Sequence, residues 1–250
     1  MITRLSLPAL GAALCLALPV QALDLGNMSA TEREMFHAEV RTYLLENPEV
    51  LMEALAVLEQ REQVEQVQTD RDLVKTNSAM LFNDGYSWVG GNPDGDITLV
   101  EFMDYRCGYC RRAFTEVEQL IELDGNIRFV LKEFPILGEE SELSARFAIA
   151  THQTAGDDAY KSVHDALIAF KGPINDTSLT RIADTLSLDA PAILAHMGSQ
   201  EVTDVISANR NLGTRLQISG TPSFVMNGQM LRGYLPLEGM MQMAEEIRAQ

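Results

Sequence analysis

The stretch ITLVEFMDYRCGYCRRAFTEVEQL, residues 97–120, decides the fold of this 250-residue chain. Its first part, residues 97–103, is a run of apolar and β-branched residues that predicts a buried strand. Its last part has apolar residues at positions 113, 114, 117 and 120, the spacing of one helix face. Cys107 and Cys110 therefore lie where a strand gives way to a helix.

This placement predicts different chemistry for the two cysteines, which are separated only by Gly108 and Tyr109. Free backbone N–H groups and the positive end of the helix dipole favour a thiolate, and they lower a cysteine pKa from about 8.5 to roughly 3.5–7.5. We expect Cys107 to be the exposed nucleophile and Cys110, one turn into the helix, to be the shielded resolving thiol. Such a pair exchanges a disulfide with a substrate through a mixed disulfide.

Two other interpretations of the cysteine pair are weaker. A structural disulfide would rarely close so tight a loop at a helix start. A zinc site needs two further ligands, yet the chain has no second C-x-x-C, and no two of its four histidines, at positions 37, 152, 164 and 196, have the spacing of a ligand pair. The motif therefore favours redox chemistry, with no metal and no cofactor besides the cysteine pair itself.

Residues 1–22 have the pattern of a secretory signal peptide. Arg4 supplies the positive start, an apolar stretch of mostly Leu and Ala follows, and small residues at 20 and 22 predict cleavage before Leu23. The stretch is too short for a good transmembrane helix. Cleavage would remove Cys15 and leave only the two motif cysteines. Export of such a chain indicates an oxidising compartment, here a bacterial periplasm.

The chain is strongly acidic, with 36 Asp and Glu against 19 Lys and Arg and a formal net charge of −17. Nucleic acids and anionic membranes are bound by basic surfaces, so neither is an expected partner. Solubility alone accounts for an acidic surface. The length suits one sizeable domain with an appendage.

That appendage is a helical N-terminal extension over residues 23–82. The sequence Ser29–Glu32 resembles a capping box and predicts a first helix that ends near Glu46. A second helix is expected over 48–80, but its apolar stripe thins after Leu58. The part from 36 to 58 is the candidate for self-association as a homo-oligomer. The alternative is that these helices pack on their own domain.

Residues 83–96 are rich in turn signals and are predicted to be a linker. The domain that follows, 97–250, begins with a strand, the motif helix and a second strand at 126–134, which implies a parallel pair with a right-handed crossover. A helical insertion is predicted over about 139–217.

The last part of the chain returns to strands. Asn227-Gly228 is the favoured two-residue turn of a hairpin over 223–232, and a closing helix is expected over 236–248. Thr221-Pro222 stands just before this hairpin. A proline that enters a strand cannot donate to the ladder, and an X–Pro bond there can be cis. Such a position leaves backbone free to pair with an extended substrate chain.

The order of these elements resembles the bacterial DsbA-like thioredoxin-fold family over about residues 95–250. The resemblance is carried by EFMDYRCGYC at 101–110, KEFPILG at 132–138 and GTPSF at 220–224. It implies an α/β thioredoxin fold with a helical insertion, preceded here by the all-helical extension.

The same resemblance implies roles for single residues. Cys107 attacks, Cys110 resolves, and Pro222 is cis. Glu101, six residues before Cys107, stands where the family places a buried acid that relays protons to the inner thiol. Lys132 is the expected partner charge of this acid.

The residues around the motif indicate a redox direction. The oxidase prototype of the family carries Pro-His between its cysteines and Val before the cis-proline. This chain has Gly108-Tyr109 and Thr221 instead, which resembles disulfide isomerases of the DsbC type. The extension resembles that of trimeric suppressor-of-copper-sensitivity C-type proteins, whose oligomer confers isomerase activity.

The sequence therefore predicts a periplasmic disulfide isomerase or reductase. Its expected partners are unfolded or misdisulfided secreted proteins, a membrane thiol reductase or oxidase, and further copies of itself in a homo-oligomer, with a trimer as the implied assembly. One alternative is a DsbA-like dithiol oxidase, which needs only a single site. Others are a copper(I)-binding protein, since two soft thiolates can hold that ion, and a holdase chaperone.

Overall fold

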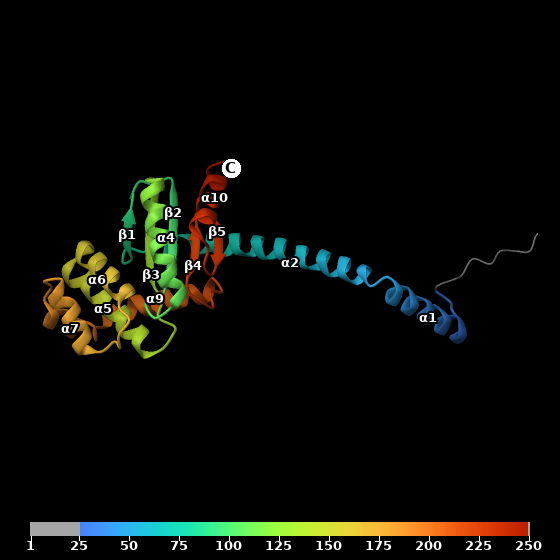
Figure 1. Cartoon of the computed structure of the whole chain (residues 1–250), viewed down its shortest axis with the longest axis horizontal. Helices are drawn as coiled ribbons and strands as arrows, with labels where there is room; N and C mark the ends of the chain where they lie inside the picture. The colour runs from blue at the N-terminus through green and yellow to red at the C-terminus, as the bar shows by residue number, and fades with distance from the viewer. Residues whose placement is uncertain (1–25, 250) are drawn as a thin grey trace, which may run out of the picture. The chain divides into compact units, whose positions relative to one another are not determined.

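A computed structural model describes residues 26–249, so the signal peptide expected at 1–22 and Cys15 lie outside the described residues. No helix in this range combines the length and apolar character needed to cross a membrane. Figure 1 shows the elements, which are α1 (Ala30–Glu46), α2 (Glu49–Thr76), α3 (Ser78–Phe82), β1 (Trp88–Gly91), β2 (Ile97–Met103), α4 (Gly108–Asp124), β3 (Ile127–Glu133), α5 (Glu139–Ala155), α6 (Asp157–Ala169), α7 (Asp176–Thr185), α8 (Ala190–His196), α9 (Gln200–Arg215), β4 (Ser223–Met226), β5 (Gln229–Arg232) and α10 (Leu237–Arg248).

The chain divides after Gln60 into two compact units. In the first unit, α1 begins with the predicted capping box, in which Ser29 and Glu32 satisfy each other's backbone N–H groups. Helix α1 buries none of its residues. Ten large apolar side chains of this unit are exposed on α1 and on the first part of α2; they are Met35, Phe36, Val40, Tyr43, Leu45, Leu51, Met52, Leu55, Val57 and Leu58.

The second unit is built on a five-stranded sheet of order β1-β3-β2-β4-β5. Strands β2 and β3 are parallel and are joined through α4, whereas the other neighbours are antiparallel. The predicted strand–helix–strand start and the hairpin at Asn227-Gly228 are therefore confirmed. Helices α5 to α9 stand between β3 and β4 as the predicted helical insertion.

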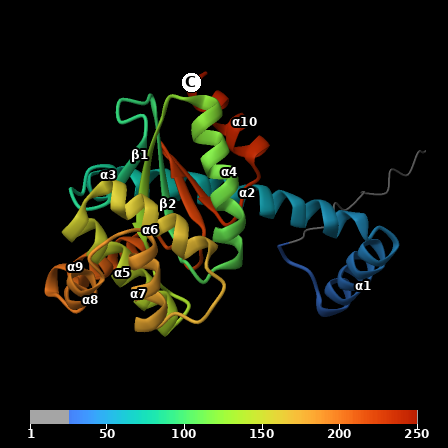
Figure 2. The same ribbon diagram turned by 60° about the vertical axis from the view of Figure 1, so that its left-hand side comes forward.

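Helices lie on both faces of the sheet (Figure 2), and each face carries a layer of buried apolar side chains. Leu99 and Met103 of β2 point into the larger core, which α4, α10 and helices α5 to α9 share. The alternate residues Val100 and Phe102 point into a smaller core, covered by α9, α3 and the end of α2. Because both faces are covered, β2 is almost entirely apolar, as its sequence predicts.

Two boundaries differ from the sequence prediction. The second helix ends at Thr76, because the Asn77 side chain donates to the carbonyl of Leu73, and the short helix α3 follows. Residues 83–96, predicted to be a linker, contain β1. Trp88 of β1 is buried and stacks on Tyr160 with ring centroids 5.8 Å apart, which brings this short segment into the sheet.

The expected pairing of Lys132 with Glu101 is wrong. Glu101 lies opposite Leu131 in the parallel register and Lys132 lies opposite Phe102, so the two charged side chains point to opposite faces of the sheet. Lys132 is instead fully buried in an ion pair with Asp84 and also donates to the Met80 carbonyl at 2.8 Å.

Burial opposes the charge of Asp84, but the attraction of Lys132 and hydrogen bonds from Ser87 outweigh it and hold the pKa of Asp84 below its usual range. The charged pair therefore attaches the segment before β1 to the sheet.

Replacing Asp84 by Asn should lower the free energy of unfolding by about 3 kcal/mol or more, because the buried Lys132 ammonium loses its counterion. Urea denaturation of the two proteins measures the difference. Asp94→Asn changes an exposed carboxylate in a neighbouring turn and should leave stability within about 0.5 kcal/mol. Equal losses in the two variants would contradict this account of the pair.

Candidate active site

Cys107 forms the N-cap of α4 and directly follows the three-residue turn, 104–106, that leaves β2. Its backbone is extended, with φ −76° and ψ 121°, and its sulfur accepts a hydrogen bond from the Cys110 N–H at 3.4 Å. The predicted placement at a helix N-terminus is confirmed. The position directs free backbone N–H groups and the positive end of the helix dipole at the sulfur.

The two thiols differ strongly in acidity. A hydrogen bond from the Cys110 side chain lowers the pKa of Cys107 to about 5, with help from the Thr221 side chain and the backbone of Cys110 and Tyr109 and against the effect of burial. Burial raises the pKa of Cys110 far above the usual range, and its hydrogen bond to Cys107 and the charge of Glu101 add to this shift. At neutral pH the negative charge therefore resides on Cys107.

The expectation that Cys107 is exposed is wrong in degree. Its relative exposure is 7%, compared with 1% for Cys110. The residues between them, Gly108 and Tyr109, are exposed, and a Cβ at Gly108 would meet nothing within 4 Å. Access to the sulfur is therefore from the side of these two residues.

The Thr221–Pro222 segment lies directly against the nucleophile, although 114 positions of sequence separate it from Cys107. The Thr221–Pro222 bond is cis, as the family resemblance implies. The Cys107 sulfur lies 3.1 Å from the Thr221 carbonyl oxygen, a hydrogen bond that only the neutral thiol can donate. The structure thus brings together the predicted residues of both halves of the domain.

Glu101 lies on the face of β2 that carries the cysteine pair and is 5% exposed. Burial raises its pKa to about 8, and the charges of Cys107, Glu118 and Glu133 add to the shift. A carboxyl group with this pKa holds its proton at neutral pH. Once it is ionised, its charge raises the pKa of Cys110.

The sequence did not identify Asp104, which organises the turn before the motif. This buried carboxylate accepts the backbone N–H of Arg106 at 2.8 Å, those of Ile136 and Leu137 at 2.9 and 3.1 Å, and the Ser141 hydroxyl at 2.8 Å. The loop after β3 is therefore held against the turn that leads to Cys107.

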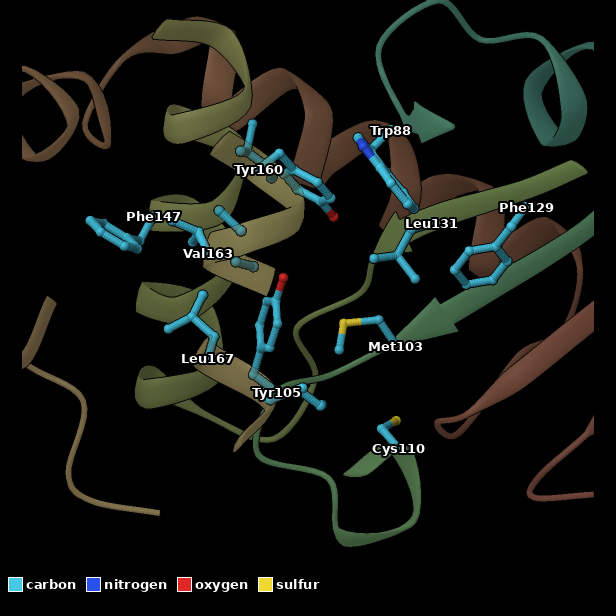
Figure 3. Close-up of a cluster of buried hydrophobic side chains, with 14 of the residues drawn as sticks. Trp88, Met103, Tyr105, Cys110, Phe129, Leu131, Phe147, Tyr160, Val163 and Leu167 are labelled. Carbon is cyan, nitrogen blue, oxygen red and sulfur yellow. The ribbon is translucent and has the colours of Figure 1, made fainter. Parts of the chain in front are cut away.

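Glu133 is the second group that the sequence did not identify. Its carboxylate oxygen Oε1 accepts the hydroxyls of Tyr105 and Tyr160, each at 2.7 Å, and His164 Nδ1 lies 3.1 Å from the Tyr105 oxygen. Burial raises the pKa of Glu133 to about 8 and lowers that of His164 to about 3. Figure 3 shows Tyr105, Tyr160 and Cys110 in one buried cluster.

One signal could have revealed Glu133. Glu133 is the last residue of β3, and Glu101 lies near the end of β2. Because the carboxyl ends of adjacent parallel strands lie at the same edge of a sheet, the two acids are expected near each other. Tyr160 and His164 come from a helix of the insertion, and no local pattern places that helix over the sheet.

Within residues 26–249 no group of three or more His, Cys, Asp or Glu side chains is arranged to hold a metal ion. The two cysteines are free thiols.

A parallel strand followed by a helix that begins at C-x-x-C, with a cis-proline against the first cysteine, defines the redox class of thioredoxin-fold proteins. The chain belongs to the family described as DSBA-like thioredoxin domain, which matches residues 98–244. Residues 32–65 match the family described as copper resistance protein ScsC N-terminal domain. The predicted DsbA-like fold and the ScsC-type extension are therefore confirmed.

Solved structures agree with this assignment. A thioredoxin-like oxidoreductase from Silicibacter pomeroyi DSS-3 is 40% identical and covers 70% of this chain and 99% of its own, with a TM-score of 0.66. BcfH from Salmonella enterica Typhimurium is 28% identical and covers 86% of this chain and 95% of its own, with a TM-score of 0.72.

A curated relative is the Na(+)/H(+) antiporter NhaA 1 of Salinispora arenicola (strain CNS-205). It is 29% identical over 153 residues, which are 61% of this chain and 23% of that protein. The chain thus spans less than a quarter of this relative, and the similarity concerns one part of a longer protein.

The reactivity of Cys107 with iodoacetamide should rise with pH around a midpoint near 5 and stay constant above it, because the thiolate is the reacting form. Alkylation rates of the reduced protein, with the site identified by mass spectrometry, measure this profile. Cys110→Ala removes the largest favourable hydrogen bond and should raise the midpoint by about one unit. A midpoint near 8.5, the value of an ordinary thiol, would contradict the capping geometry.

The raised pKa of Glu101 predicts that the free energy of unfolding depends on pH. Between its ordinary value of 4.5 and about 8 the folded protein holds a proton that the unfolded chain releases, so this group lowers stability as pH rises through that window. The free energy of unfolding of Glu101→Gln should therefore rise by roughly 3–4 kcal/mol relative to the parent protein between pH 5 and pH 8.

Urea denaturation at several pH values measures this gain. Glu122→Gln, an exposed change on α4, is the control and should show no such pH-dependent gain. If the free energies of unfolding of Glu101→Gln and the parent protein differ by the same amount from pH 5 to pH 8, Glu101 is ionised in the folded state.

Proposed function

We propose that this chain is a periplasmic thiol–disulfide oxidoreductase that acts on protein disulfides, with disulfide isomerisation or reduction as its main activity. The observation that carries the proposal is the acidic, N-capping Cys107 paired with a shielded Cys110. In this mechanism the Cys107 thiolate attacks a substrate disulfide and forms a mixed disulfide. Cys110 resolves it, or the substrate's own thiol displaces Cys107 after rearrangement.

Glu101 is assigned to proton transfer with Cys110. Cys110 must lose its proton before it can attack the mixed disulfide, and burial alone makes this loss unfavourable. A carboxyl group on the same face, with a pKa near neutrality, is suited to exchange that proton. Thr221 and Pro222 are assigned to backbone contact with an extended substrate, since they lie against the attacking sulfur.

Unfolded or misdisulfided proteins are the proposed substrates. Exposed apolar side chains stand near the motif: Tyr109 is 62% exposed, and Leu137 and Ile136 are 54% and 38% exposed on the loop that Asp104 holds. Apolar surface beside the nucleophile suits chains that have not buried their own apolar residues.

The N-terminal extension supports the isomerase proposal, because the first unit of the chain exposes ten large apolar side chains on its helices. Helices with uncovered apolar residues are suited to association with copies of themselves, and several sites on one particle can hold a misfolded substrate while its bonds are exchanged. We assign the extension to homo-oligomer formation. A membrane thiol reductase would keep Cys107 reduced.

A DsbA-like dithiol oxidase is the second candidate, and the acidity of Cys107 favours it. A stabilised thiolate favours the reduced form, which makes the Cys107–Cys110 disulfide more oxidising. Copper(I) binding by the two thiolates is a weaker third candidate.

Recovery of activity from scrambled-disulfide ribonuclease separates these functions. We expect the protein without its signal segment to restore activity and to be oligomeric by light scattering. Leu55→Gln combined with Leu58→Gln should give a smaller assembly and reduce the rescue by about tenfold. Both leucines are about half exposed, with 51% relative exposure.

Glu53→Gln combined with Glu62→Gln changes two exposed polar positions of the same helix and is the matched control. The structure also shows where the extension can be removed: a deletion should stop at residue 60, because Val74 and Leu81 belong to the core of the second unit. Failure of rescue together with rapid oxidation of reduced ribonuclease would identify a thiol oxidase.

A further inference from the structure

Three arginines lie within five residues of the candidate nucleophile in the sequence of this acidic chain. Arg106 directly precedes Cys107, and Arg111 and Arg112 lie in the first two turns of α4. Arg111 is close enough for its charge to interact with that of Cys107. The chain has 36 acidic and 19 basic residues, so three arginines so close in sequence to one cysteine are unusual for its composition.

Two of these arginines, Arg111 and Arg112, form no ion pair within residues 26–249. Arg106 pairs with Glu140 at 3.0 Å and donates to the Gly172 carbonyl. Arg111 donates through Nε and Nη2 to the Tyr105 carbonyl at 3.1 and 3.0 Å. Within the described range, neither Arg111 nor Arg112 has an Asp or Glu at ion-pair distance. Their charge is available to a binding partner.

Aromatic side chains complete the surface and fix its geometry. The Arg112 guanidinium lies over the ring of Tyr234, 4.6 Å from its centroid. The Tyr234 ring lies in turn 6.2 Å from that of Tyr109, the exposed residue between the cysteines. We call Arg106, Arg111, Arg112, Tyr109 and Tyr234 the arginine–tyrosine rim. The stacked guanidinium loses less conformational entropy when it binds a carboxylate.

We propose that the arginine–tyrosine rim binds an acidic peptide segment that flanks the disulfide under attack, so that the protein selects disulfides with neighbouring carboxylates. The inference rests on the proposed thiol–disulfide exchange at Cys107. Arginine recognises carboxylates through paired N–H donors, and the tyrosines supply contact area for the peptide. Extended polyanions such as nucleic acids are disfavoured by the net charge of −17.

The rim would assist thiol–disulfide exchange between Cys107 and the target disulfide. The Cys107 thiolate attacks one sulfur of the target disulfide, a Cys107–target S–S bond forms, and the other target sulfur leaves as a thiolate. Cys110 then loses its proton and attacks the Cys107 sulfur, which forms the Cys107–Cys110 disulfide and releases the second target thiolate. The target gains two electrons and the cysteine pair loses two. Cations beside Cys107 stabilise the negative charge of the departing sulfur.

The test uses three disulfide-linked peptide dimers that differ only in the residues beside their cysteine, which are Glu, Gln or Lys. The reduced protein without its signal segment is oxidised by each dimer, and the second-order rate is divided by the rate at which 2-mercaptoethanol reduces the same dimer. This ratio removes the intrinsic effect of flanking charge on the disulfide. We expect the Glu dimer to exceed the Lys dimer by about tenfold at low salt, and we expect salt to weaken this preference.

Variants identify the charges responsible. Arg112→Gln and Arg111→Gln should each lower the preference by about threefold, whereas Arg111→Lys, which keeps the charge, should retain most of it. Arg128→Gln removes the same charge at the start of β3, the end of the parallel pair away from the motif, and should leave the preference unchanged.

Equal normalised rates for the Glu and Lys dimers, or a preference that survives in both glutamine variants, would overturn the inference. If Arg111→Gln does not fold because the Tyr105 carbonyl loses its donors, Arg112→Gln decides the question, since the Arg112 guanidinium packs on the Tyr234 ring. Exchange with all three dimers but without preference refutes only the rim. Absence of exchange with any dimer refutes the proposed function as well.

Discussion

The contact on which this site depends is the capping of α4 by the sulfur of Cys107. The end of a central parallel strand delivers the chain to that point, and the helix that returns to the sheet must begin there. Its first N–H groups therefore face a sulfur, and this electrostatic environment makes the thiolate the stable form. The same geometry places Cys110 one turn deeper, where burial keeps it neutral. The division between an attacking and a resolving thiol thus follows from the position of one helix end.

The two faces of the sheet bury two different sets of ionisable side chains. On one face Lys132 and Asp84 form a compensated pair that secures the segment before β1. On the other face Glu101 and Glu133 form no ion pair within residues 26–249, and burial raises the pKa of both to about 8. A protein gains nothing in stability from two such carboxyl groups, which is typical of positions kept for chemistry. Their neighbours also differ, since Glu133 accepts two tyrosine hydroxyls while Glu101 acts on the cysteines.

The sequence predicts most of the fold because its local signals agree with one another. The strand–motif–helix run, the Asn227-Gly228 turn and the capping box at Ser29 each specify their elements. The errors have physical causes. Strand β1 is four residues long within a turn-rich segment, and Trp88 needs Tyr160 from a distant helix to enter the core. The partner of Lys132 depends on the face of the sheet to which its side chain points. Side chains alternate between the two faces along each strand, so this face is known only when the register of β3 on β2 is known.

The most direct test of the account is to trap the intermediate. Cys110→Ala should form a stable mixed disulfide with a protein that contains a non-native disulfide, because the resolving thiol is absent. Mass spectrometry of the digested adduct then identifies the attacking sulfur. The account predicts a bond from Cys107 to the substrate, and no comparable adduct in Cys107→Ala, where the remaining thiol is buried and protonated. Adduct formation by Cys110 at a similar rate would show that the helix cap does not select the nucleophile.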